Sequence, residues 1–309
     1  MPPFLRGFIS SLTRGTYTVY LFTETDIVPF LCPALAMGMV LAGPPDALAL
    51  FEGIVWTELH LLAFQVRRNL SSSHDGSDPV SLQTKNQLLG LPEDRISKPH
   101  RPLPAGRITP EATRILHFTF VAASLALSAY RGLLSCSALY FAATYAYNEG
   151  GLATIGVLKS ALSAVGYVCY GWGMTVCFDR GRPLSPLARS SLIMIGTVFA
   201  TTGYAQDFRD RAGDAAVGRK TMPLVLPQAF ARWLLGVMLF GWTSALVYFW
   251  EPPVAFSLLL GGLALTSTML FVRGCTEAAD ARAYWWYSLW LIACHVFPIF
   301  PRLRDAVDT

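Results

Sequence analysis

The stretch PVAFSLLLGGLALTSTMLFVR, residues 253–273, carries no charge before its last residue. A helix of this length rises about 30 Å, which matches the hydrocarbon core of a bilayer. Comparable apolar runs recur along the chain: 27–43, 47–66, 113–130, 132–148, 154–178, 190–206, 229–249, 253–273 and 284–300. The sequence therefore predicts an all-α, multi-pass membrane protein with nine transmembrane helices.

The composition agrees with this class, because 53% of the 309 residues are hydrophobic and only 14% are charged. A soluble protein with buried helices is the alternative, but apolar runs of about 20 residues are typical of membrane spans. The six cysteines lie in or beside these runs without Cys-x-x-Cys spacing, which indicates buried apolar residues rather than disulfides or zinc ligands. No shift in composition marks a domain boundary, so we expect one domain over residues 1–309.

The basic residues are divided unequally between the two sides that nine spans create. The N-terminus and the loops after even-numbered spans share one side, and that side holds most of the Lys and Arg. The positive-inside rule places it in the cytoplasm. The first 14 residues lack the pattern of a cleavable signal. Because the basic residues alternate with acidic ones and form no known nucleic-acid-binding motif, we expect no nucleic-acid partner.

Two charged stretches on that side interrupt the apolar runs. The first is NQLLGLPEDRISKPHRPLP, residues 86–104. On a helix, Asn86 and Asp94 share a face because they are eight residues apart, and Glu93 lies beside Asp94. Lys98 and Arg101 follow, and three prolines then end the helix.

The second charged stretch is DFRDRAGDAAVGRKTMP, residues 207–223. Asp207, Asp210 and Asp214 are spaced i, i+3, i+7, which predicts one stripe of carboxylates along a helix. Carboxylates this close repel one another, so either a cation lies among them or they are solvated. Four basic residues surround them, including Lys220.

Lys159 is the one basic residue within the run 154–178, and Asn148 and Glu149 are close to it in sequence. A lysine inside a membrane span indicates a functional site with an anion as its partner. The alternative is a side chain that reaches the membrane interface. His60 has no second ligand at metal-binding spacing, so we interpret it as a hydrogen-bonded interior histidine.

Residues 67–85 are polar and lack helical periodicity, which is typical of a loop. Without them, residues 64–66 would continue directly into 86–87 as one helix. We interpret 67–85 as an insertion or as an error in the gene model, such as a retained intron. Sequencing the transcript distinguishes the two.

Carboxylates from two loops with basic residues between them suit a magnesium-bound diphosphate, because Mg²⁺ prefers a few carboxylate oxygens together with phosphate oxygens. The basic groups neutralise the remaining charge. The predicted metal ligands are Asn86, Glu93, Asp94, Asp207, Asp210 and Asp214, and the predicted diphosphate-binding residues are Lys98, Arg101, Lys159 and Lys220. Above an apolar cavity, this site would hold a prenyl diphosphate at the cytoplasmic face with its tail in the membrane, and aromatic faces would shield the allylic cation.

The two stretches resemble the aspartate-rich motifs of the UbiA superfamily of intramembrane prenyltransferases, which read approximately Asn-Asp-x-x-Asp-x-x-x-Asp and Asp-x-x-x-Asp. The runs that follow these motifs in the family, Lys-Pro-x-Arg-Pro and Gly-x-x-Thr-x-Pro, are present at 98–102 and 218–223. The resemblance covers most of the chain apart from 67–85. It implies nine helices around a central cavity, a Mg²⁺ cofactor, a prenyl diphosphate substrate, and catalytic roles for Asn86, Asp94 and the three aspartates of the second motif.

Gln87 and Gly90 replace two aspartates of the family pattern, and Glu93 is the carboxylate that compensates. This version resembles a fungal branch in which some members are terpene cyclases and others join a prenyl chain to an aromatic acceptor. We expect a cyclase of secondary metabolism acting on farnesyl or geranylgeranyl diphosphate. The spans offer few convergent polar groups for an acceptor, although Glu58, His60 and Asn148 are candidates.

An aromatic prenyltransferase is therefore the alternative within the family. A transporter or structural membrane protein that binds ions is the alternative from another class, but transport would place charges nearer the bilayer midplane. The resemblance also implies the endoplasmic reticulum as the membrane.

Overall fold

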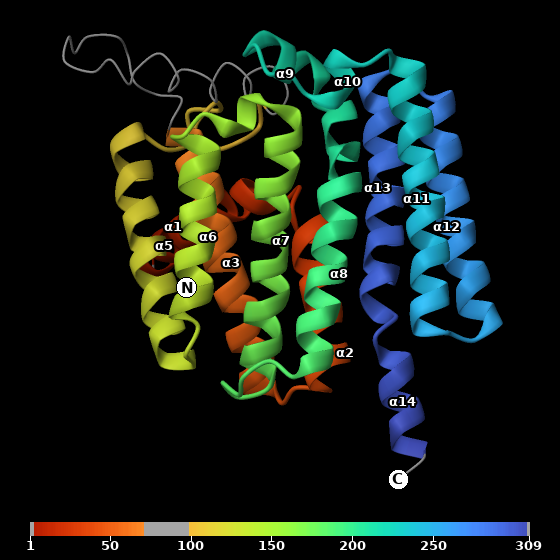
Figure 1. The fold of residues 1–309 in the computed structure, drawn as a ribbon. Coiled ribbons are helices and arrows are strands. Elements are labelled where there is room, and N and C mark those ends of the chain that lie inside the picture. Colours follow the sequence, from red (N-terminus) through yellow and green to blue (C-terminus); the bar gives the residue numbers. More distant parts are fainter. Residues whose placement is uncertain (1–2, 71–98, 308–309) are drawn as a thin grey trace.

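The computed structural model describes residues 3–70 and 99–307, which form a bundle of helices packed side by side (Figure 1). Within these residues the β-type pairing is limited to one isolated bridge, between Ile155 and Lys220. The helices are α1 (Pro3–Thr23), η1 (Ile27–Leu31), α2 (Cys32–Ala42), α3 (Ala47–Leu70), α5 (Pro110–Arg131), α6 (Leu134–Asn148), η2 (Leu152–Thr154), α7 (Gly156–Phe178), α8 (Pro186–Thr202), η3 (Gly203–Phe208), α9 (Arg211–Ala216), α10 (Met222–Val225), α11 (Gln228–Trp250), α12 (Val254–Arg273), α13 (Glu277–Val296) and α14 (Ile299–Val307).

All nine apolar runs are helical, which confirms the all-α, multi-pass class, but the predicted count of nine transmembrane helices is not confirmed. In the described chain, six segments are long and apolar enough to cross a membrane: Ala47–Arg67, Pro110–Arg131, Gly156–Phe178, Gln228–Trp250, Val254–Arg273 and Glu277–Arg304. A seventh counts if Leu12–Thr23 and Ile27–Ala42 form one span bent by 63°. α6 and α8 have 15 and 17 residues, which is shorter than a typical span of about 20.

The first residues of the loop predicted at 67–85 are helical, because α3 continues through Leu70. The remaining residues of the predicted loop, 71–85, lie outside the described part of the chain, as does 86–98, which contains most of the first charged stretch.

Three helices begin with the same local signal, a hydroxyl residue whose side chain accepts a hydrogen bond from the backbone three residues on. Thr109, Ser185 and Thr276 do this at the starts of α5, α8 and α13, with distances of 3.2, 3.1 and 3.2 Å. Such caps satisfy a backbone N–H group that the first helical turn leaves unpaired.

α7 is central to the bundle and packs against α2, α3, α6 and α8. Gly173 lets α3 approach closely, because a Cβ at this position would lie 2.0 Å from the Trp56 ring. The packing at this end of α7 is therefore tight.

Polar groups buried between α3, α5 and α6 bond to one another. The indole of Trp56 donates to Ser128 Oγ at 2.8 Å, and the Ser128 and Ser137 hydroxyls are 2.6 Å apart. His60 Nε2 lies 2.8 Å from Ser137 Oγ, and Nδ1 lies 2.8 Å from the Trp56 carbonyl. The interpretation of His60 as a hydrogen-bonded interior residue is confirmed.

Candidate active site

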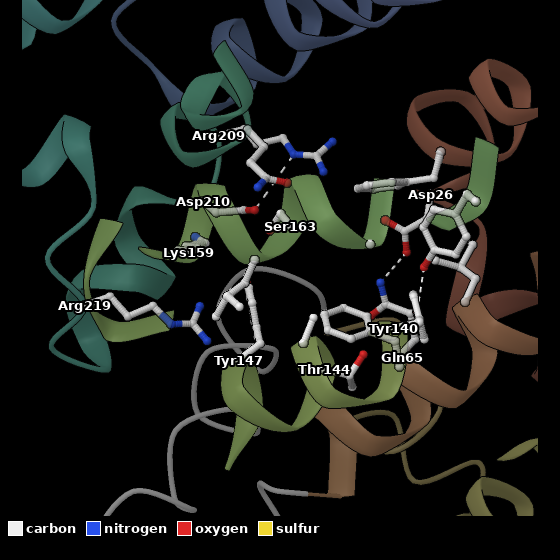
Figure 2. Close-up of a pocket in the computed structure, with 18 residues that line it drawn as sticks. Asp26, Gln65, Tyr140, Thr144, Tyr147, Lys159, Ser163, Arg209, Asp210 and Arg219 are labelled. Carbon is white, nitrogen blue, oxygen red and sulfur yellow. Dashed lines mark hydrogen bonds and ion pairs between the residues drawn. The ribbon is translucent and has the colours of Figure 1, made fainter. Parts of the chain in front are cut away.

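A cavity lies between α3, α6, α7 and the segment that joins α8 to α9, with η1 on a further side (Figure 2). About 780 Å³ of space lies within its lining, part of it open to solvent. The lining residues are Asp26, Phe30, Leu61, Phe64, Gln65, Tyr140, Ala143, Thr144, Tyr147, Lys159, Leu162, Ser163, Gly166, Tyr170, Gln206, Arg209, Asp210 and Arg219.

Charged residues gather at one end of this cavity. Lys159 Nζ lies 2.7 Å from Asp207 Oδ1 and 3.1 Å from Asp214 Oδ2, and Arg219 donates to Asp214 Oδ1 at 2.8 Å. All four side chains are buried. The second motif therefore holds a cation among its carboxylates, and in this structure that cation is a residue of α7.

Burial also shifts the protonation of this group. Desolvation raises the pKa of the Asp207 carboxyl to about 6, and the ion pair with Lys159 opposes the rise. Both carboxylate oxygens of Asp207 are buried and have no hydrogen-bond partner with good geometry, so the Lys159 ion pair is what compensates them.

The predicted single stripe of three aspartates is wrong, because the chain breaks between two short helices. Asp207 lies in η3, Asp210 precedes α9, and Asp214 lies in α9. The break turns Asp210 toward the cavity while the other two carboxylates bind Lys159.

The backbone bridge decides which of two neighbouring basic residues reaches the cavity. Lys220 N donates to the Thr154 carbonyl at 2.8 Å, and Gly156 N donates to the Lys220 carbonyl at 2.9 Å. Successive side chains of an extended segment point to opposite sides. Arg219 therefore lines the cavity, whereas the Lys220 side chain is exposed, although Lys220 was the residue predicted to bind diphosphate.

Residues of α11 and α13 hold α9 in place. Arg232 donates to both oxygens of Asp280, at 2.6 and 2.9 Å, and Arg211 lies 3.1 Å from the same carboxylate. The guanidinium of Arg209 lies over the Tyr284 ring of α13 at 4.0 Å and 3.9 Å from Asp210. Arg211 thus anchors the motif, while Arg209 lines the cavity.

The other end of the cavity is aromatic. The hydroxyls of Tyr140 and Tyr170 are 2.7 Å apart, and Tyr140 also donates to the His60 carbonyl at 2.9 Å. Phe30 packs edge-on against Tyr170, with ring centroids 6.1 Å apart. Among the described lining residues, the charged one at this end is Asp26, whose carboxylate accepts a 2.6 Å hydrogen bond from Gln65.

The sequence-predicted residues divide into three groups. Lys159, Asp207, Asp210 and Asp214 come together at the charged end. Arg101, which is buried, and Lys220, which is exposed, do not line the cavity. Asn86, Glu93, Asp94 and Lys98 lie outside the described residues.

Sequence reasoning missed Asp26, Gln65, Arg209 and Arg219 as cavity residues. Arg209 and Arg219 lie within the second charged stretch, so their position was a signal. Asp26 directly precedes the run 27–43, and only the fold brings it to the cavity.

The model of the UbiA prenyltransferase family matches residues 30–292. The chain belongs to the UbiA prenyltransferase family. Over 287 residues it is 42% identical to the fumagillin beta-trans-bergamotene synthase of Aspergillus fumigatus, with 93% of each chain aligned. It is 27% identical over 297 residues to the somaliensene A/B synthase of Streptomyces somaliensis, covering 91% of this chain and 92% of that one. This member of the UbiA family is an enzyme of the terpene cyclase and prenyltransferase kind.

Solved structures agree with the fold. A UbiA homolog from Archaeoglobus fulgidus bound to GPP and Mg²⁺ aligns with a TM-score of 0.57 at 15% identity, covering 91% of this chain and 99% of that one. The same homolog bound to DMAPP and Mg²⁺ aligns with a TM-score of 0.55.

Asp210 of the second motif fits one ligand of a magnesium ion beside a diphosphate, because it presents a carboxylate to the cavity. Asp207 and Asp214 are paired with Lys159 and do not line the cavity. Among the described residues, however, no three His, Cys, Asp or Glu side chains are arranged to hold a metal by themselves. A complete set of ligands would therefore include phosphate oxygens and the predicted ligands of the first motif.

Proposed function

We propose that this enzyme is a Mg²⁺-dependent intramembrane terpene cyclase that ionises farnesyl or geranylgeranyl diphosphate and cyclises the allylic cation. The observation that carries the proposal is the polarity of one cavity: Lys159, Arg209, Arg219 and Asp210 lie at one end, and tyrosine and phenylalanine rings at the other (Figure 2). An amphiphile with a diphosphate head and a hydrocarbon tail has the same polarity.

At the charged end, the ammonium of Lys159 and the guanidinium groups of Arg209 and Arg219 bind and neutralise the diphosphate. Their positive charge stabilises the leaving group as the allylic C–O bond breaks. Asp210, with Asn86, Glu93 and Asp94 of the first motif, would hold Mg²⁺. When bound, the metal supplies further charge neutralisation of the leaving diphosphate.

At the aromatic end, the rings of Phe30, Tyr140 and Tyr170 face a substrate that carries positive charge. Aromatic faces attract cations, and the rings at this end help to keep water from the allylic cation. The allylic cation then reacts with another part of the same prenyl group.

Cyclisation is favoured over transfer to a phenol by the positions of three polar residues. Glu58, His60 and Asn148 were the candidate acceptor ligands, and none of them lines the cavity. His60 is committed to Ser137 and the Trp56 backbone. The 42% identical relative also carries the name of a terpene synthase.

We further propose that the protein resides in the endoplasmic reticulum membrane, with the charged end of the cavity on the cytoplasmic side. The excess of basic residues in loops on that side supports this orientation. Cysteine labelling of the exposed Lys220 position in sealed microsomes tests it.

The proposed reaction is tested with the purified protein, Mg²⁺ and a single prenyl diphosphate, either farnesyl or geranylgeranyl. Released diphosphate and extracted hydrocarbons are measured without any acceptor. A cyclic hydrocarbon formed under these conditions supports cyclisation. A product that forms only after a phenol is added supports the aromatic prenyltransferase. If diphosphate release is absent, or is the same in the wild type and in Asp210→Ala, the result supports an ion-binding membrane protein.

A further inference from the structure

Asp26 is a buried carboxylate of the cavity to which the chemistry described above gives no role. It closes the turn between α1 and η1, and only 4% of its surface is exposed. Its side chain does not cap η1. Oδ2 accepts a hydrogen bond from Gln65 at 2.6 Å, and among the described residues no hydrogen bond reaches Oδ1. A buried carboxylate that is hydrogen-bonded through one oxygen alone is costly, which indicates a function for the other oxygen.

Asp26 lies at the end of the cavity away from the charged group. Figure 2 shows Asp26, Gln65 and Tyr140 together at one end, Lys159, Asp210 and Arg219 at the other, and Ser163 between them. Along α7, the lining residues Lys159 and Tyr170 are 11 residues apart, which corresponds to about 16 Å. A prenyl chain whose diphosphate binds at Lys159 therefore extends its distant carbons toward Asp26.

The end of a cyclisation needs a proton acceptor near those distant carbons. Among the cavity-lining residues the carboxylates are Asp26 and Asp210. Asp210 lies beside Arg209 in the group that binds the headgroup, whereas Asp26 lies beside the rings that would surround the cation. A carboxylate close to a carbocation stabilises it electrostatically and can also accept a proton from it.

We propose that Asp26 is the catalytic base that ends the cyclisation, an inference that rests on the proposed cyclase function. The ionised Oδ1 takes a proton from a carbon adjacent to the cationic centre. The electron pair of that C–H bond becomes the π bond of the new alkene, and the carboxylate becomes a neutral carboxylic acid. The proton passes to water when the hydrocarbon leaves and the cavity fills again. Gln65 holds Oδ2 and so orients the carboxylate.

The test compares three variants of the full-length protein with the wild type, using farnesyl and geranylgeranyl diphosphate separately. Asp26→Asn removes the base but keeps the size of the side chain and an acceptor for Gln65. Asp26→Glu keeps a carboxylate and moves it by one methylene. Glu58→Gln is the matched control, because Glu58 lies near Asp26 but does not line the cavity.

The expected result for Asp26→Asn is diphosphate release near the wild-type rate, with the wild-type alkene reduced by about 100-fold per diphosphate released. Alcohols formed by water capture and other alkenes replace it. Asp26→Glu restores alkenes with a shifted double bond, and Glu58→Gln leaves the products unchanged.

Two results overturn the proposal. If Asp26→Asn gives the wild-type alkene in wild-type yield, the released diphosphate or water takes the proton instead. If diphosphate release falls in parallel with the alkene in both Asp26 variants, Asp26 acts in ionisation or folding. A wild-type protein that forms no hydrocarbon from either substrate contradicts the proposed function itself, and is thereby distinguished from failure of the Asp26 inference alone.

Discussion

The Lys159 ammonium lies 2.7 Å from the Asp207 carboxylate, and both side chains are buried. This contact joins the start of α7 to the second aspartate-rich motif. Because Asp214 is also within 3.1 Å, one internal cation holds together two carboxylates that would otherwise repel each other. The charged end of the cavity is thus held together by contacts within the protein itself.

Replacing Lys159 by glutamine is expected to lower both stability and activity. Leaving buried carboxylates without their counter-charge costs roughly 3–5 kcal/mol of unfolding free energy. Thermal unfolding in detergent and diphosphate release measure the two effects. The matched control is Lys220→Gln, because that neighbour of Arg219 is exposed and outside the cavity. Equal losses in the two variants would show that the buried position of Lys159 is unimportant.

Asp280→Asn is expected to loosen the second motif without touching the cavity. Asp280 pairs with Arg232 and Arg211, so its loss leaves the buried guanidinium of Arg232 without its counter-charge, at a cost of about 3 kcal/mol or more. We expect a lower melting temperature and reduced turnover. Glu277→Gln is the control, since Glu277 accepts an exposed hydrogen bond from the same helix α9. A melting temperature unchanged by Asp280→Asn would argue against this anchor.

Gly166→Leu is expected to shorten the substrates that the enzyme accepts. Gly166 lines the cavity between its two ends, and a Cβ there would lie 3.6 Å from the Tyr140 ring, so a larger side chain must extend into the cavity. We expect kcat/KM for geranylgeranyl diphosphate to fall more than that for farnesyl diphosphate. Gly241→Leu in α11 should change neither value, because a Cβ at that position would meet no atom within 4 Å. Parallel losses for both substrates after Gly166→Leu would contradict the assignment of this residue to the part of the cavity that binds the hydrocarbon tail.

Removal of Mg²⁺ by a chelator is expected to abolish diphosphate release, and added Mg²⁺ should restore it. Asp210→Asn should raise the Mg²⁺ concentration needed for half-maximal rate by at least about tenfold. This is the smallest loss of metal affinity that is typical when a residue that only supports a metal ligand is replaced. Titrations of the rate with Mg²⁺ measure this shift. A variant with the wild-type Mg²⁺ requirement would remove Asp210 from the metal site.

The helices of the nine apolar runs could be predicted from the sequence because each depends on a local property, the run itself. All nine runs are helical in the structure, and 253–273 corresponds closely to α12. Their lengths were harder to judge. α6 and α8 are shorter than a full span because they end at short helices and turns at the charged end of the bundle, and apolar composition alone does not reveal this.

The partner of Lys159 shows the limit for the site. Asn148 and Glu149 are near Lys159 in sequence, yet Glu149 pairs with Arg67 of α3 while Lys159 pairs with Asp207 and Asp214. The gathering of acidic residues in the second motif was visible in the sequence. The cation that pairs with these acidic residues is set by the packing of α7 against the segment after α8. This packing is a long-range property that the sequence does not reveal.

The orientation of a prenyl diphosphate in the cavity is the central claim, and a structure with Mg²⁺ and an unreactive prenyl thiodiphosphate tests it most directly. We predict the diphosphate beside Lys159, Arg219 and Asp210, and the hydrocarbon chain extending toward Tyr140 and Tyr170. A headgroup bound at the aromatic end, or outside this cavity, would contradict the account.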